Sequence, residues 1–212
     1  MSKTAVFGIL AVIILAIGIV FFAQSFKKED NSLSTTAASP TPLALAKQEA
    51  TKESVIMTKK AYSNPPQTLA ATQISGKKAR IKTAYGDIVF ELFPEAPKAA
   101  SNFMFLAGDK FYDGLTFHRR EEGFVIQGGD PSGNGTGGPG YSFEDEKVTR
   151  DYKRGIVAMA NSGPNTNGSQ FFIMLADNPL PKNYTIFGNV LQGIDVVDKI
   201  KVGDKMNEVV IE

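Results

Sequence analysis

The chain has 212 residues, a net charge of +1, no cysteine and a single histidine, His118. The lack of cysteine excludes disulfides and thiolate nucleophiles, and zinc sites usually draw on several His or Cys ligands, so the composition argues against a metal enzyme. Residues 75–212 carry 16 basic and 18 acidic side chains. This balance argues against nucleic-acid binding, which needs a concentrated basic face.

An uncharged apolar segment, residues 4–26, follows a short N-terminal tail of residues 1–3. As a helix rising about 1.5 Å per residue, it is long enough to cross a hydrocarbon core of about 30 Å. A signal peptide has a shorter apolar core and a small-residue cleavage site, for which residues 23–25 (AQS) are the candidate. The length favours a retained transmembrane anchor or uncleaved signal, with the folded domain outside the cytoplasm; secretion after cleavage is the alternative.

The next segment, residues 27–74, is rich in Ser, Thr, Ala, Lys, Gln and Pro and has few large apolar residues. It shows no sustained hydrophobic period. Such a composition favours a disordered tether.

From residue 75 the pattern changes to short alternating segments typical of a folded domain, which we place at residues 75–212. A hairpin is predicted over residues 79–93, and helices over residues 97–108 and 193–200. Further strands are predicted at residues 115–119, 124–129, 155–160, 169–175, 184–190 and 207–212. Many short strands and two helices favour a mainly β fold, a closed antiparallel barrel with helices at its ends.

Few of the residues in this domain could perform covalent chemistry. The Gly-rich residues 128–140 lack the Gly-Lys-Ser/Thr ending of a P-loop, so a surface loop with positive φ angles is the better interpretation. A lone histidine such as His118 is usually structural. In LTFHR, alternation places Arg119 on one face with Phe117; Arg119 either pairs with a carboxylate there or donates into a partly dry groove.

The stretch GPNTNGSQFFIML, residues 163–175, joins a loose loop directly to an apolar strand. It is either an ordinary turn that enters a buried strand, or a loop that holds a groove open. In the second case Gln170 and one of the two phenylalanines face a ligand.

Several motifs together resemble the cyclophilin family of peptidyl-prolyl cis–trans isomerases (rotamases). They are FHR at 117–119, GFVIQGGDP at 123–131, GNGTGGPGY at 133–141, FEDE at 143–146, MANSGPNTNGSQFFI at 159–173 and YTIFGNV at 184–190. The resemblance covers residues 79–212 and implies a closed eight-stranded antiparallel barrel capped by two helices. It implies a protein-folding enzyme that needs no cofactor or metal, acts on proline-containing polypeptides and is monomeric.

The resemblance also assigns the site residues. It makes Arg119 the catalytic residue, and it places ten side chains in all around the substrate: Arg119, Phe124, Val125, Gln127, Ala160, Asn161, Gln170, Phe172, Leu180 and Tyr184. Three positions depart from the family pattern: Val125 replaces a methionine, Pro179 a tryptophan and Tyr184 a histidine. A proline-binding module without turnover is the alternative function. With the anchor, the resemblance predicts an isomerase that acts on exported proteins beside the membrane.

Overall fold

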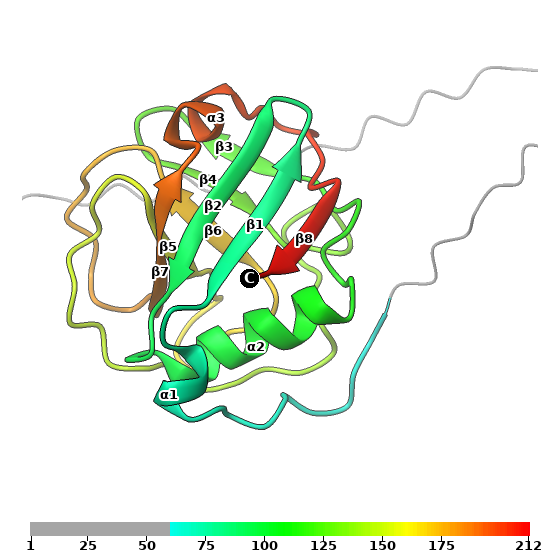
Figure 1. Cartoon of the computed structure of the whole chain (residues 1–212), viewed down its shortest axis with the longest axis vertical. Coiled ribbons are helices and arrows are strands. Elements are labelled where there is room, and N and C mark those ends of the chain that lie inside the picture. Colours follow the sequence, from blue (N-terminus) through cyan, green and yellow to red (C-terminus); the bar gives the residue numbers. More distant parts are fainter. Residues whose placement is uncertain (1–59) are drawn as a thin grey trace, which may run out of the picture. The chain divides into compact units, whose positions relative to one another are not determined.

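The computed structural model describes residues 60–212 (Figure 1). The predicted anchor and residues 27–59 of the predicted tether lie outside the described residues. Among the helices of the described part, none combines the length and the apolar character that crossing a membrane requires.

The described chain forms one antiparallel sheet of eight strands in the order β3-β4-β6-β5-β7-β2-β1-β8 (Figure 1). The strands are rich in Val, Ile and Phe, residues that suit a pleated and buried surface. Their bounds are β1 Lys78–Thr83, β2 Gly86–Leu92, β3 Arg119–Glu121, β4 Val125–Gly128, β5 Ile156–Met159, β6 Phe171–Met174, β7 Ile186–Gln192 and β8 Glu208–Ile211. The prediction of a mainly β fold with eight antiparallel strands is confirmed.

Closure of this sheet into a barrel is not confirmed. Strands β3 and β8 stand at the two ends of the order, and no ladder joins them in the described chain. The segments that precede them do meet, because Thr116 and Lys205 form an isolated antiparallel bridge. The sheet is therefore curled, with its two ends brought together by the segments before β3 and β8 rather than by paired strands.

Three helices accompany the sheet: α1 Ala71–Ile74, α2 Pro97–Gly108 and α3 Ile194–Lys199. Pro97 occupies the start of α2, where its missing N–H is no loss. The carboxylate of Glu146 accepts hydrogen bonds from the N–H groups of Lys98 and Ala99, both at 2.9 Å. Figure 1 shows α2 and α3 near opposite ends of the strands. The two longer helices were predicted, and α1 was not.

Two apolar clusters occupy the two faces of the sheet because successive side chains of a strand point to opposite sides. Strand β6 shows this directly: Phe171 belongs to the inner core with Phe103 and Phe187, whereas Phe172 belongs to the other cluster with Val125. The expectation that Phe171 faces the core is confirmed. The second cluster supplies the floor of the site described below.

Residues 60–74, expected to belong to the tether, lie along the folded part. Ile74 is fully buried, and Leu69 packs against the core. The N–H of Leu69 donates to Ser101 Oγ at 2.8 Å. Residues 60–74 therefore pack with the folded part of the chain. The sequence pattern missed this because the few apolar residues that dock here are too widely spaced to produce a period.

The turn before α3 supports a test of the fold. Gly193 has φ +81°, and a Cβ at this position would lie 2.1 Å from the carbonyl oxygen of Asp87. We expect Gly193→Ala to lower the free energy of unfolding by about 2–3 kcal/mol, from backbone strain and the clash. Urea unfolding monitored by circular dichroism measures it.

The matched control is Gly108→Ala, since Gly108 is helical and a Cβ there would meet nothing within 4 Å. This variant should be as stable as the parent or more stable by about 0.5–1 kcal/mol. Equal unfolding midpoints for the two variants would contradict the structure of the turn.

Candidate active site

Nine of the ten predicted site residues surround one pocket of about 200 Å³. They come from β3, β4 and β6, from the turn between β3 and β4, from the chain just after β5, and from the connection between β6 and β7. The pocket is lined by Arg119, Phe124, Val125, Gln127, Ala160, Asn161, Phe172, Leu180 and Tyr184. The structure thus brings together residues separated by more than sixty positions in the chain.

The floor of this pocket is apolar and rigid. Phe172 and Val125 are only 5% and 2% exposed. The ring of Tyr184 meets that of Phe172 edge-on, with 5.6 Å between the ring centroids. Such edge-to-face contacts hold both rings in place. A small apolar ring is the kind of group that this floor can accept.

Strand register places the polar side of the pocket. Arg119 on β3 lies opposite Gln127 on β4, and Gln127 lies opposite Phe172 on β6. Directly opposed residues of antiparallel strands project from the same face of a sheet. A guanidinium, an amide and an aromatic ring therefore stand in a row across three strands.

The Arg119 guanidinium is held from two sides. Its Nε donates to Glu121 Oε1 at 3.0 Å and its Nη2 donates to the same carboxylate, while Nη1 donates to Gln127 Oε1 at 2.9 Å. Its Cζ lies 5.9 Å from the ring centroid of Phe124. A guanidinium has five N–H donors, so one N–H on each Nη is left for a ligand. The interpretation that Arg119 pairs with a carboxylate is confirmed. Arg119 also lines the pocket, and its donation to a ligand there stays a prediction.

Glu121 was not among the predicted site residues. A signal for it was present, because residues two apart in a strand share a face and the sequence reads Arg119, Arg120, Glu121. The intervening Arg120 points elsewhere and donates to the carbonyl oxygen of Ile200 at 2.9 Å.

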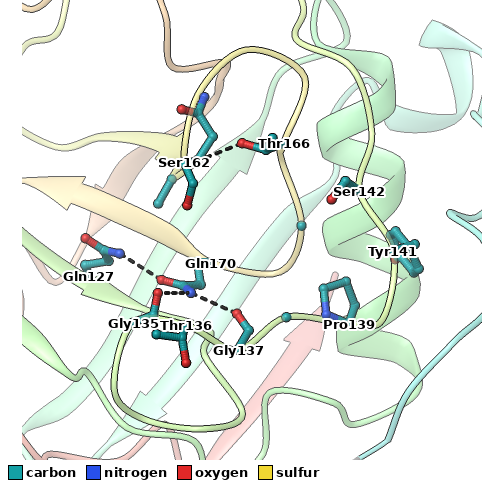
Figure 2. A pocket seen from close by; sticks show the side chains of 14 residues that line it. Gln127, Gly135, Thr136, Gly137, Pro139, Tyr141, Ser142, Ser162, Thr166 and Gln170 are labelled. Carbon is teal, nitrogen blue, oxygen red and sulfur yellow. Dashed lines mark hydrogen bonds between the residues drawn. The ribbon is translucent and has the colours of Figure 1, made fainter.

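Gln170 lies beside this pocket and connects it to a second one. Gln127 Nε2 donates to Gln170 Oε1 at 2.9 Å, and Gln170 Nε2 donates to the carbonyl oxygens of Gly135 and Gly137 at 3.0 and 2.8 Å (Figure 2). The second pocket has about 290 Å³ and shares Gln127, Ala160 and Asn161 with the first. The two pockets are adjacent, with these three residues between them, and together they are called the groove.

The Gly-rich loop that borders the second pocket is organised by Asp130. Its carboxylate accepts hydrogen bonds from the backbone N–H groups of Ser132 at 2.6 Å, Asn134 at 3.0 Å and Gly135 at 2.5 Å. Burial alone would raise the pKa of Asp130, but these backbone donors lower it below its ordinary value. Gly133 and Gly135 have φ angles of +68° and +90°, which confirms a loop with positive φ angles.

The expectation that Phe117 and Arg119 share a face is wrong. Phe117 is fully buried in the inner core, whereas Arg119 lines the pocket. Phe117 precedes β3, and its backbone bonds Asp204 and Gly203 rather than β4, so regular alternation does not run through it. His118 lines neither pocket. No group of three acidic or histidine side chains that could hold a metal ion occurs within residues 60–212.

Comparison with known proteins gives matches over this part of the chain. The family model of the cyclophilin-type peptidyl-prolyl cis–trans isomerases matches residues 78–212. A peptidyl-prolyl cis–trans isomerase of Helicobacter pylori is 46% identical over 157 residues, which cover 71% of this chain and 94% of that protein. The isomerase CYP18-1 of Arabidopsis thaliana is 51% identical over 125 residues, covering 56% and 78%.

Solved structures agree with these matches. A crystal structure of a cyclophilin-type isomerase from Cryptosporidium parvum aligns with a TM-score of 0.61 and 39% identity, covering 64% of this chain and 97% of that one. A crystal structure of the same protein in the presence of the dipeptide Ala-Pro aligns with a TM-score of 0.60.

The role of Asp130 in the loop is testable. We expect Asp130→Asn to lower the free energy of unfolding by about 2 kcal/mol at neutral pH, because charge-assisted hydrogen bonds to the loop are lost. A lowered pKa stabilises the fold above the ordinary aspartate pKa, and this contribution disappears as the pH falls through the folded-state pKa. The difference between parent and variant should therefore shrink below about pH 4.

Urea unfolding of parent and variant at neutral pH and below about pH 4 measures this difference. The control is Asp151→Asn, since Asp151 is exposed and pairs with Lys182 at 2.9 Å; its stability should hardly change. A difference for Asp130→Asn that persists undiminished in acid would contradict the assigned role.

Proposed function

Since the chain belongs to the cyclophilin-type peptidyl-prolyl cis–trans isomerases, we propose that the first pocket binds the prolyl ring of a polypeptide and that Arg119 stabilises the twisted X-Pro amide. The observation that carries this proposal is the guanidinium placed at the edge of a pocket with an apolar floor, with one N–H on each Nη not used by Glu121 or Gln127. The reaction makes and breaks no covalent bond. It therefore requires no nucleophile, general acid or cofactor.

The barrier to rotation is about 18–20 kcal/mol because resonance gives the amide C–N bond partial double-bond character. Spontaneous exchange takes on the order of tens to hundreds of seconds. When the amide twists, the prolyl nitrogen becomes pyramidal and gains a lone pair, which the planar forms do not offer. A donor that reaches this nitrogen binds the twisted form better than either planar form, and this difference is what accelerates the reaction.

The geometry of Arg119 suits such a donor. Glu121 and Gln127 hold the guanidinium before substrate arrives, so little reorganisation is needed during the twist. Phe172, Val125, Phe124 and Leu180 would hold the ring, while Ala160, Asn161 and Gln127 flank the adjacent backbone. A chain whose proline fills the first pocket would extend past these shared residues into the second pocket.

A proline-binding module without turnover is the second candidate, and one observation favours it. The bond to Glu121 neutralises part of the positive charge that Arg119 could direct at the amide. The ion pair is solvent-exposed, with side chains 44% and 51% exposed, so solvent screens its charge although the bonds still orient the guanidinium. The guanidinium therefore keeps donor strength for a substrate, and we favour turnover.

For the whole chain we propose a membrane-tethered, monomeric isomerase whose domain faces exported polypeptides outside the cytoplasm. The support is the uncharged segment at residues 4–26, followed by a polar segment and then the folded domain. Secretion after cleavage within residues 23–25 remains the alternative.

Replacing the guanidinium tests the catalytic proposal. We expect Arg119→Ala to lower kcat/KM for a proline tetrapeptide on the order of 100-fold, as loss of a preorganised donor typically does. Arg80→Ala is the matched control, because Arg80 is also paired with carboxylates, Asp87 and Glu212, but lies outside the pocket. Binding without rate enhancement by the parent protein would select the module instead.

Fractionation tests the anchor. Full-length protein expressed in bacteria should remain in the membrane pellet after an alkaline wash, because a buried apolar helix of this length is held by the hydrophobic effect rather than by charge. A soluble protein trimmed at its N-terminus would overturn the anchor and leave the isomerase proposal intact.

A further inference from the structure

A segment that precedes the family domain is hydrogen-bonded to the Gly-rich loop beside the groove. We call residues 60–69 the strap; they lie outside the family match, which begins at residue 78. The ring of Tyr62 in the strap packs among three other aromatic rings, with centroid distances of 5.2 Å to Phe105, 6.1 Å to Phe111 and 6.4 Å to Tyr141. A tyrosine in such a cluster buries the apolar surface of its ring, and its hydroxyl usually forms a hydrogen bond.

Polar contacts fix the strap at the same point. Tyr62 Oη donates to Asp109 Oδ2 at 2.5 Å, and Lys60 Nζ lies 3.2 Å from the same carboxylate oxygen. Burial and the bond to Asp109 raise the pKa of the Tyr62 hydroxyl far above its usual range, so it remains a donor. The N–H of Tyr62 donates to the carbonyl oxygen of Pro139 at 2.8 Å. One residue of the strap thus bonds both α2's C-terminal end and the Gly-rich loop.

The loop is shaped to receive the strap. Gly140 has φ +99°, and a Cβ there would lie 2.6 Å from the carbonyl oxygen and 3.1 Å from the nitrogen of Tyr62. The two backbones approach so closely that only glycine fits. The contact is therefore specified from both sides, by a tyrosine in the strap and a glycine in the loop.

The same loop residues form a wall of the second pocket. Pro139 and Tyr141 line it, on the side away from Gln127 (Figure 2). Tyr141 Oη donates to Asn102 Oδ1 at 2.5 Å, which ties this wall to α2. Removing the strap would take away the hydrogen bond to Pro139 and the ring against Tyr141, and the wall would keep its bond from Tyr141 to Asn102.

We propose that the strap holds residues 139–141 in the conformation that the second pocket needs, and that Tyr62 is a positioning residue for the part of the substrate that extends beyond the prolyl ring. This inference rests on the proposed function of the groove. Tyr62 does not line either pocket, so it acts through Pro139 and Tyr141. Arg119 is bonded by Glu121 and Gln127, and the stretch of the loop that holds Gln170 is fixed at Gly135 by Asp130 rather than by the strap.

The test uses the full-length protein and two peptides. One is a capped Ala-Pro dipeptide too short to leave the first pocket, and the other extends by several residues on both sides of the same Ala-Pro. We expect Tyr62→Ala to raise KM for the long peptide about 3- to 10-fold, because the ring against Tyr141 and the hydroxyl bond that anchors the strap to Asp109 are both lost, while the backbone N–H bond to Pro139 remains. The KM for the dipeptide and both kcat values should stay within about twofold, since these contacts do not touch Arg119.

Three further variants make the result specific. Tyr85→Ala removes an exposed tyrosine in the turn between β1 and β2 and should change neither KM. Tyr62→Phe keeps the ring and should have an intermediate KM for the long peptide. In Gly140→Ala the added Cβ would displace the strap from the loop, so this variant should raise KM for the long peptide as Tyr62→Ala does. Thermal unfolding establishes that each variant is folded.

The outcomes separate the two proposals. A purely structural role for Tyr62 would lower the unfolding temperature and leave the ratio of the two KM values unchanged, which would overturn the strap proposal alone. A parent protein that accelerates neither peptide would overturn the proposed function, and the strap proposal with it.

Discussion

The proposed function depends on one constraint, which is that a long and flexible arginine side chain must point at one spot before substrate binds. Arg119 is fixed by Glu121 on its own strand and by Gln127 on the next. Gln127 is in turn fixed by Gln170, whose amide is held by backbone carbonyls of the Gly-rich loop. This continuous chain of hydrogen bonds crosses from a loop to an edge strand. It converts a side chain with about 2 kcal/mol of rotamer entropy into a preorganised donor.

The sheet makes this arrangement possible because it has two apolar faces. Alternation along β6 sends Phe171 into the inner core and Phe172 into the pocket floor. The register of β3, β4 and β6 then sets Arg119, Gln127 and Phe172 side by side. The same four-residue strand therefore carries part of the core and part of the site, so the packing of the core fixes the position of the floor.

The sequence supported much of this, and the limits have physical causes. The alternation of the strands and the helix beginning at Pro97 could be predicted from local patterns, and the nine residues that line the first pocket could be named from the resemblance to a family. The alternation rule predicted the wrong face for Phe117 because the backbone of that residue bonds a distant segment and not the neighbouring strand. The strap was missed because Tyr62 and Leu69 stand alone among polar residues. Their partners on α2 and in the Gly-rich loop are distant in sequence, and a local hydrophobic period cannot indicate such contacts.

The central claim is that Arg119 binds the twisted amide more strongly than the planar one. The most direct test compares ground-state affinity with catalysis in Arg119→Lys, which keeps the charge and loses the fixed fork of donors. The dissociation constant of an X-Pro peptide, measured by calorimetry, should stay within about threefold of the parent, while the cis–trans exchange rate on the enzyme, measured by NMR exchange spectroscopy, should fall on the order of 100-fold. Affinity that declines in parallel with the exchange rate would show that Arg119 binds planar and twisted forms alike, and would contradict the account.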